Sequence, residues 1–395
     1  MHVAILSARC GHVHRGAERM SNEFYKGLSH ETKVFSLYAS DWTVQVPGIP
    51  RTDSRYKYYL YPVNALDKIR NIHRICRGIV NLPLKLIPYN SCFLDKWDLE
   101  IITFALNINK SLAQFKPDVV INQTGSLVGL AMRKFRRIHH VPFIQICGAG
   151  NNIIEIKNAQ TQPDAYVAQT PSGLEFIKKR FPGLNIKLIP NGFDHKLYTQ
   201  ETGKISIERL QELSKSKDVQ LEHPIILSTS ALDKVKRLDT LIHAISLLPS
   251  GTLIFTSDGD ERENLISLGK KLLGKRFVYL GVVPEKELPK IYKTADVFCI
   301  TSIGEPFGNV IVEALGANTP VVADDDLDRR WMIGEGGILT DVRDVRKLAA
   351  AIQAASEKDW GTKPRDQALS RFTWEKVMRQ YDELIQEVYL NFHAM

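Results

Sequence analysis

The chain has 395 residues, 44% of them hydrophobic and 24% charged, a composition that fits two or three globular domains and excludes a disordered, collagen-like or coiled-coil protein. Its formal net charge is +8, yet residues 1–140 contain 20 basic and 10 acidic side chains, so the positive excess lies entirely in the first third. This asymmetry indicates that one part of the molecule meets an anionic partner, such as a membrane surface, a nucleic acid or a phosphorylated ligand.

Strands and helices alternate through the first half of the chain, which is typical of a parallel sheet covered by helices on both faces. Residues 41–98 are the exception, because Pro, Tyr and basic residues interrupt any regular period there. We predict strands at residues 3–6, 33–37, 118–122, 143–147, 165–168 and 186–189, and helices at residues 17–28, 99–115, 127–135 and 172–181.

A second alternating series follows the turn-forming residues 189–194 and a polar stretch that ends at residue 223. We therefore expect an α/β protein with two doubly wound, Rossmann-like domains facing each other across a cleft, in which ligands bind at the carboxyl ends of the strands. We predict strands at residues 225–228, 253–257, 278–280, 297–300 and 320–323, and helices at residues 238–248, 261–273, 285–293, 309–315, 344–356 and 374–389, the last with Thr373 as its N-cap.

Residues 304–314 are the most informative motif, because they follow an apolar strand and open a helix. Gly308 and the proline before it shape a loop that leaves the backbone N–H groups of residues 307–309 exposed, and such a helix N-terminus binds phosphate. Glu305 and Glu313 place two carboxylates beside it, and a carboxylate accepts hydrogen bonds from sugar hydroxyls. The alternative is a capped helix with ordinary surface acids.

Basic residues follow the first strand of the second series, in the segment 233–239. Lys236 supplies a point charge for a diphosphate, and Arg237 can bind phosphate with two donors. Basic residues before a helix are more often solvated, so this signal alone is weak. Asp258 lies in a turn after the next strand, near the same edge of the predicted sheet.

Taken together, the second half resembles the nucleotide-sugar domain of retaining GT-B glycosyltransferases of family 4. The resemblance covers residues 225–355, the turn 189–194 and the last helix. It rests on KRLDTLI at 236–242, DGD at 258–260, LGVVP at 280–284, LPKIYKTADVF at 288–298, the two glutamates of an E-x7-E motif and TPVVA at 319–323.

The resemblance implies a role for each matching residue. Lys236 would bind the donor diphosphate, Glu305 the hydroxyls of the donor sugar, and Glu313 the ribose hydroxyls. The nucleotide base would lie near Val282, and a glycine-rich loop at Gly16 in the first domain would approach the phosphates. The implied catalytic residues are Glu305, Lys236 and Arg237, and the implied donor-binding residues are Gly16, Asp258, Val282, Phe307, Gly308, Asn309 and Glu313.

Three positions depart from the family pattern. The Gly-Arg pair that commonly precedes the lysine is replaced by Ser230 and Ala231, so that Arg237 would supply the missing charge. The first glycine of the N-terminal loop is Arg15. The histidine that often follows a strand of the first domain is missing from residues 147–152, where an asparagine, Asn151 or Asn152, could replace its hydrogen bond.

The expected function is transfer of a sugar from a nucleoside-diphosphate sugar to an acceptor hydroxyl with retention, without a metal. Asp324, Asp325 and Asp326 are interpreted as a solvated loop rather than a metal site. The expected domains are residues 1–195 on the acceptor side, residues 196–370 for the nucleotide sugar, and residues 371–395 as a helix that packs back toward the first domain. The alternative is a catalytically degenerate GT-B protein that acts as a binding subunit.

The expected partners are the nucleotide sugar and a sugar or lipid-linked acceptor. The basic residues 51–90 could lie on an anionic membrane or form a solvated loop. A nucleic-acid binder is permitted by the charge, but the sugar-nucleotide motifs do not require one, and we expect none. Five cysteines without a C-x-x-C pair, no secretory signal and no membrane-spanning run indicate a cytoplasmic protein, with peripheral membrane contact as a further possibility.

Overall fold

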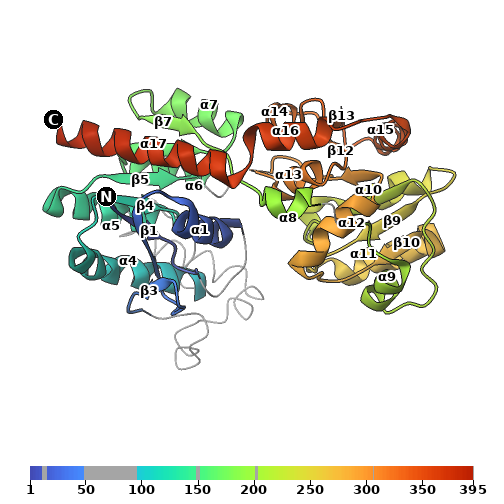
Figure 1. The fold of residues 1–395 in the computed structure, drawn as a ribbon, viewed down its shortest axis with the longest axis horizontal. Coiled ribbons are helices and arrows are strands. Elements are labelled where there is room, and N and C mark those ends of the chain that lie inside the picture. The colour runs from blue at the N-terminus through green and yellow to red at the C-terminus, as the bar shows by residue number, and fades with distance from the viewer. Residues whose placement is uncertain (11–15, 49–95, 148–151, 201–202, 306, 395) are drawn as a thin grey trace, which may run out of the picture. The chain divides into compact units, whose positions relative to one another are not determined.

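The computed structural model describes residues 1–10, 16–48, 96–147, 152–200, 203–305 and 307–394 (Figure 1). These residues form two compact units. The first comprises Met1–Gln169, Gly173–Ile189 and Met378–Met395, and the second comprises Thr170–Ser172 and Pro190–Val377. The division between them after the last strand of the first unit therefore falls at Ile189, before the expected residue 195.

The first unit contains a parallel sheet with the strand order β3-β2-β1-β4-β5-β6-β7. Its central strands are buried along their whole length, because helices cover both faces of a doubly wound sheet. The strands are β1 (His2–Leu6), β2 (Glu31–Ser36), β3 (Thr43–Gln45), β4 (Val119–Asn122), β5 (Phe143–Ile146), β6 (Ala165–Ala168) and β7 (Ile186–Leu188).

The helices of this unit include the end of the chain. From Met378 onward, helix α17 (Trp374–His393), red in Figure 1, packs on the first unit through Tyr381, whose ring lies edge-on to Phe24 at 4.6 Å. At its start Thr373 accepts a hydrogen bond from the Lys376 N–H at 3.4 Å, which confirms the predicted cap. The other helices are α1 (Gly16–Gly27), α4 (Lys96–Phe115), α5 (Ser126–His139), α6 (Asn152–Gln160) and α7 (Pro171–Arg180).

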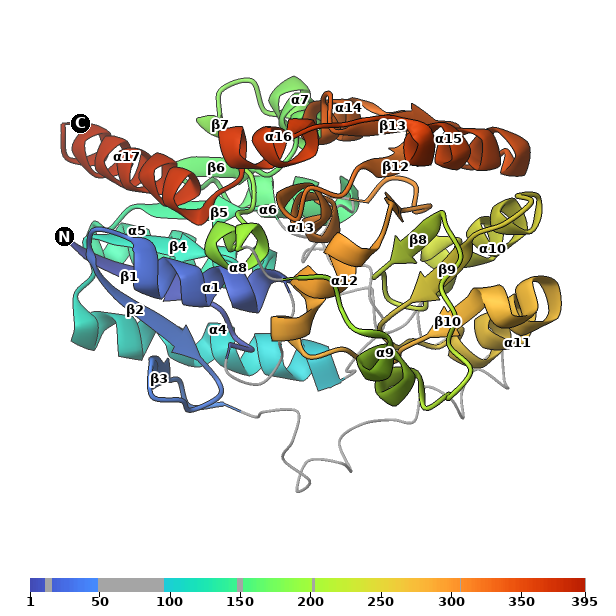
Figure 2. The same ribbon diagram turned by 45° about the vertical axis from the view of Figure 1, so that its right-hand side comes forward.

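The second unit contains a parallel sheet with the strand order β10-β9-β8-β11-β12-β13 (Figure 2). Successive side chains of its strands enter two separate apolar cores, as the two-residue period of a strand requires: Ile225 and Leu227 join one core, and Ile226 joins the other. The strands are β8 (Ile225–Ser228), β9 (Thr252–Phe255), β10 (Phe277–Tyr279), β11 (Val297–Cys299), β12 (Val321–Asp324) and β13 (Gly337–Thr340).

Helices cover both faces of this sheet. Those that bury the core around Ile226 are α10 (Leu238–Ser246), α11 (Arg262–Leu273) and α15 (Val345–Glu357). Those that bury the core around Ile225 are α8 (His195–Thr199), α9 (Ile207–Ser214), α12 (Leu288–Thr294), α13 (Asn309–Gly316), α14 (Leu327–Ile333) and α16 (Lys363–Arg371).

The predicted fold class of two doubly wound Rossmann-like sheets is confirmed, while the cleft between them stays a prediction. Several elements were not predicted. Helices α8 and α9 occupy the stretch interpreted as polar. Each buries one side chain fully, Tyr198 or Leu210, and packs a second one, Leu197 or Leu213, partly buried against the same core. The predicted helix 285–293 begins as the 3-10 helix η5 (Glu285–Glu287) and continues as α12. The other elements missed are β3, α6, α14, β13 and α16.

Candidate functional site

The second sheet reverses its direction of growth between two neighbouring strands, β8 and β11. The chain leaves β8 toward β9 on one side, and it leaves β11 toward β12 on the other. The loops that follow these strands therefore diverge at their carboxyl ends, which is where open α/β sheets bind ligands. The first loop carries Lys236 and Arg237, and the second carries Glu305.

The structure joins two of the predicted catalytic residues directly. The Nζ atom of Lys236 lies 2.6 Å from Oε1 of Glu305, and both side chains are largely withdrawn from solvent. The hydroxyl of Ser302 donates a hydrogen bond to the other carboxylate oxygen of Glu305. A cation and an anion thus stand together at the sheet edge, each with a functional group that a phosphate or a sugar hydroxyl could engage.

The loop that carries Lys236 is fixed from the neighbouring strand. Thr301, fully buried after β11, donates its hydroxyl to the carbonyl oxygens of Lys236 at 2.6 Å and Arg237 at 3.1 Å. Arg237 has a left-handed backbone with φ of 52° at the start of α10. Within the described residues, its Nε has no hydrogen-bond partner and is buried. The main chain of Lys236 and Arg237 is therefore held in place by the residue that follows the neighbouring strand.

Helix α13 begins at the same edge, one loop after Glu305. Gly308 is its N-cap residue, and no described side chain caps this end, so its first N–H groups remain available. The Phe307 ring points into the core, where it meets Phe372 edge-on at 5.9 Å, so only its backbone can reach a ligand. The Asn309 side chain accepts a hydrogen bond from Asn191 at 3.2 Å.

Glu313 lies one turn further along α13 and is 6% exposed. The Tyr292 hydroxyl donates to its Oε2 at 3.2 Å and lies 2.8 Å from the Thr229 hydroxyl. Burial raises the pKa of Tyr292 well above its ordinary value, and the Glu313 carboxylate raises it further. The tyrosine therefore stays a donor that orients Glu313, while the predicted role of Glu313 toward ribose stays a prediction.

The remaining predicted residues of the second unit form no hydrogen bond or ion pair with Lys236 or Glu305 among the residues described. Asp258 follows β9, is about half exposed, and pairs with Arg262 at 3.3 Å. Val282 follows β10 and is 74% exposed, and its predicted contact with the nucleotide base stays a prediction. Gly16 is the first residue of α1, which belongs to the first unit.

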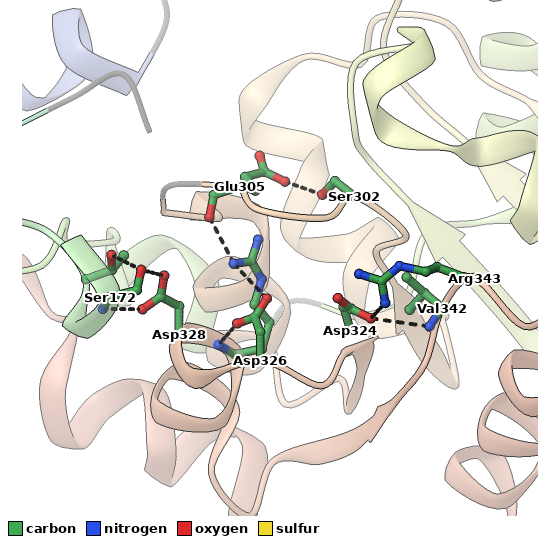
Figure 3. A network of polar contacts seen from close by, with 10 residues as sticks. Ser172, Ser302, Glu305, Asp324, Asp326, Asp328, Val342 and Arg343 are labelled. Atoms are coloured by element: carbon green, nitrogen blue, oxygen red, sulfur yellow. Dashed lines mark hydrogen bonds and ion pairs between the residues drawn. The ribbon is translucent and has the colours of Figure 1, made fainter. Parts of the chain in front are cut away.

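Residues 324–326 are only partly the solvated loop that the sequence suggested, because Asp324 is buried while Asp325 is exposed; Figure 3 shows Asp324 and Asp326. Asp324 ends β12, is 5% exposed, and lies 3.6 Å from Nη1 of Arg343. Asp325 pairs with Arg330 at 2.6 Å on the surface, and Asp326 caps α14. In the described ranges, no three His, Cys, Asp or Glu side chains gather as metal ligands.

Sequence reasoning missed the side chains that hold the predicted ones in place. Ser302 precedes Glu305 by three residues, a spacing at which serine commonly bonds to a neighbouring group, so this signal was available. Thr301 and Tyr292 bond to residues more than twenty positions away in the chain and gave no local signal. Two parts of the prediction lie outside the described residues. One is the segment 148–151, where the family histidine would stand and where Asn151 lies, together with the side chain of Asn152. The other is the basic segment 51–90.

Comparisons with known proteins concern the family and the fold. Residues 211–371 match the family Glycosyl transferases group 1. This segment is therefore similar to group 1 glycosyltransferase domains. The lipopolysaccharide core biosynthesis glycosyltransferase LpsE of Rhizobium meliloti (strain 1021) is 28% identical over 193 residues, which cover 48% of this chain and 53% of LpsE. The chain thus spans about half the length of the curated relatives it matches.

Solved structures match nearly the whole chain. Sucrose-phosphate synthase from Thermosynechococcus elongatus has a TM-score of 0.73 at 18% identity and covers 99% of each chain. Anabaena Alr3699/HepE in complex with UDP-glucose has a TM-score of 0.68 at 19% identity and covers 98% of this chain and 100% of its own. At such identities the likeness concerns the fold, which is GT-B. Among the described residues, no helix has the length and apolar character to cross a membrane.

Proposed function

We propose that this protein transfers a hexosyl group from a nucleoside-diphosphate sugar to an acceptor hydroxyl, with retention of anomeric configuration, as enzymes of family 4 do. The observation that carries the proposal is the Lys236–Glu305 pair, 2.6 Å apart, at the switch point of a domain similar to group 1 glycosyltransferases. Lysine supplies a charge for the diphosphate, and glutamate supplies two acceptors for sugar hydroxyls. Glycan, polysaccharide or glycolipid synthesis is the setting we infer.

Donor binding would exchange one set of contacts for another. Without a donor, Lys236 and Glu305 neutralise each other in a partly buried position. A donor would offer its diphosphate to Lys236 and its hydroxyls to Glu305, so neither charge would be left without a partner. Ser302 would keep the carboxylate in place during this exchange, because it already bonds to the second oxygen.

The transfer step breaks the bond between the anomeric carbon and the phosphate oxygen, and the electron pair leaves with the diphosphate. Lys236, Arg237 and the N-terminus of α13 would stabilise that growing negative charge without a metal. The acceptor oxygen attacks on the face from which the phosphate departs, and the departing phosphate takes the acceptor proton. Attack on this face accounts for retention and requires no nucleophilic side chain.

The acceptor side of the proposal is a sugar or a lipid-linked sugar. Contact of residues 51–90 with an anionic membrane belongs to the same proposal, because a lipid-linked acceptor would be met at such a surface. Vesicles test it directly. Retention of the protein on anionic vesicles, but not on neutral ones at low salt, is expected, and equal retention on both would contradict it.

Calorimetry with UDP, GDP, ADP and CMP tests the donor site. We expect one nucleotide to bind the wild type in about the micromolar range and to lose at least about tenfold in affinity with Lys236→Ala. Lys234→Ala is the matched control, because Lys234 is an exposed lysine of the same 3-10 helix, η3 (Lys234–Lys236). No binding of any nucleotide to the wild type would overturn the proposal.

Glu305→Ala separates an enzyme from a degenerate binding subunit. An enzyme should lose transfer or donor hydrolysis with this variant, measured as release of the nucleoside diphosphate. A protein that only binds partners would show no turnover in the wild type, and its partner interaction would survive the substitution.

A further inference from the structure

Arg329 is the most deeply buried charged side chain near the candidate site. It is 1% exposed, although it stands beside Arg330, whose side chain is largely exposed. Its Nη1 donates a hydrogen bond to the main-chain carbonyl of Glu305 at 2.9 Å and lies 3.3 Å from Oδ2 of Asp326. Burying a guanidinium is costly, so its position calls for an explanation beyond surface charge.

The contact with Glu305 completes a three-sided attachment. Lys236 and Ser302 hold the carboxylate, and Arg329 holds the carbonyl of the same residue (Figure 3 draws the carbonyl contact). The residue before Glu305 is Gly304, with φ of +68°, a region that glycine enters freely. Glycine allows the loop several backbone conformations. The hydrogen bond from Arg329 to the Glu305 carbonyl therefore fixes one of them, in which the Glu305 carboxylate faces Lys236 and Ser302.

Arg329 is not arranged for maximal stability. Its Nη2 is buried and has no hydrogen-bond partner in the described part of the chain. A buried donor without a partner lowers stability, and an apolar side chain of similar length would avoid that loss. The helix cap does not need the guanidinium either, since Asp326 caps α14 through the backbone N–H of residue 329.

We propose that Arg329 is a positioning residue for the donor sugar, which acts by holding the Glu305 carbonyl and so aims the Glu305 carboxylate at the sugar hydroxyls. This inference rests on the proposed function. It predicts that Arg329 matters for the sugar and little for the nucleotide, because its contact is with Glu305 and not with the first turn of α13.

The test compares the affinity for a sugar nucleotide with that for its nucleoside diphosphate by calorimetry. The pairs are UDP-glucose with UDP, GDP-mannose with GDP and ADP-glucose with ADP, and the pair whose diphosphate the wild type binds is used. Arg329→Met should lower this affinity ratio about tenfold, while diphosphate affinity changes less than about threefold. Arg330→Met is the matched control on the same helix and should leave the ratio within about twofold of the wild type.

A double-mutant cycle shows whether Arg329 acts through Glu305. In a Glu305→Ala background, Arg329→Met should change the ratio by less than about twofold, because the carboxylate to be aimed is already gone. Full additivity of the two losses would overturn the inference. The inference would also be overturned if the wild type and Glu305→Ala had the same ratio of sugar-nucleotide to diphosphate affinity. The Glu305 carboxylate would then make no contact with the sugar.

Arg329→Lys provides a second variant if Arg329→Met does not fold. Lysine keeps the charge and one donor, so we expect a partial loss of about threefold in the ratio. In that case, a ratio equal to the wild type would overturn the inference. A folded Arg329→Met with an unchanged ratio would overturn the inference alone, whereas a wild type that binds no nucleotide would overturn the proposed function together with it.

Discussion

The two units share one architecture but place different chemistry at the carboxyl ends of their strands. In the first unit, the uncharged amides of Asn122 and Gln145 are fully buried and bond to each other at 2.7 Å. In the second, the charged Lys236 and Glu305 meet at a partly exposed edge. The amides satisfy one another and stabilise the sheet, whereas the ion pair can be exchanged for an anionic, hydroxyl-rich ligand.

The largest expected effect comes from the charged edge. Glu305→Gln keeps the size of the side chain but removes the charge that faces Lys236, so we expect transfer to slow by about a hundredfold or more. Release of the nucleoside diphosphate measures it. Near wild-type turnover in this variant would show that the Lys236–Glu305 pair only stabilises the fold, as the Asn122–Gln145 pair does in the first unit.

The next effect concerns stability at the uncharged edge. Asn122→Leu removes the donor to the buried Oε1 of Gln145, whose Nε2 keeps its bonds to main-chain carbonyls, and this loss should lower the free energy of unfolding by about 1–3 kcal/mol in urea titrations. Donor affinity should stay within about threefold of the wild type, because the second unit keeps its own contacts. A larger loss of donor affinity would contradict the separation of roles.

A pH effect is expected in both units alike. Burial raises the pKa of Tyr166 in the first unit, helped by Glu155, and raises that of Tyr292 in the second. In the unfolded chain, tyrosine ionises near pH 10, so the free energy of unfolding should fall as pH rises above about 10, by at most about 1.4 kcal/mol per pH unit and tyrosine. Replacing either tyrosine with phenylalanine should flatten this slope, and an unchanged slope would contradict the assignment.

The smallest effect is expected at the surface pair of Asp325 and Arg330. A hydrogen bond from Arg330 lowers the pKa of Asp325, so the small stabilisation it provides should be lost as pH falls below about 4. Because both side chains of this pair are exposed, Asp325→Asn should lower Tm only slightly near neutral pH. A clear fall in Tm at neutral pH would show that this exposed pair matters as much as the inner ones.

Much of the fold and the candidate site could be predicted because their signals are local. The strands are continuous apolar runs, and the glycines and proline around Glu305 mark a loop before a helix. Arg329 could not be predicted, because two adjacent arginines look equally solvated in the sequence. The two arginines differ in burial because α14 begins after Asp326 and directs the Arg329 guanidinium toward the Glu305 loop.

The shortest helices were missed for a related reason. Helix α8 has five residues and only one fully buried side chain, Tyr198, which gives no measurable period. Strand β13 is only partly buried along its length, so it lacks the apolar run that revealed the central strands. In both cases the neighbours in the folded chain, and not the local sequence, determine the structure.

The way the chain divides between its units affects how the protein can be dissected. The family match begins at residue 211, yet Phe193, Tyr198 and Leu210 already fill the core of the second unit. The first unit, in turn, needs the final helix, where Tyr381 and Ile385 are fully buried. A fragment meant to fold as the second unit must therefore start at Pro190, and a stable first unit requires residues 378–395 to be rejoined to residue 189 by a linker.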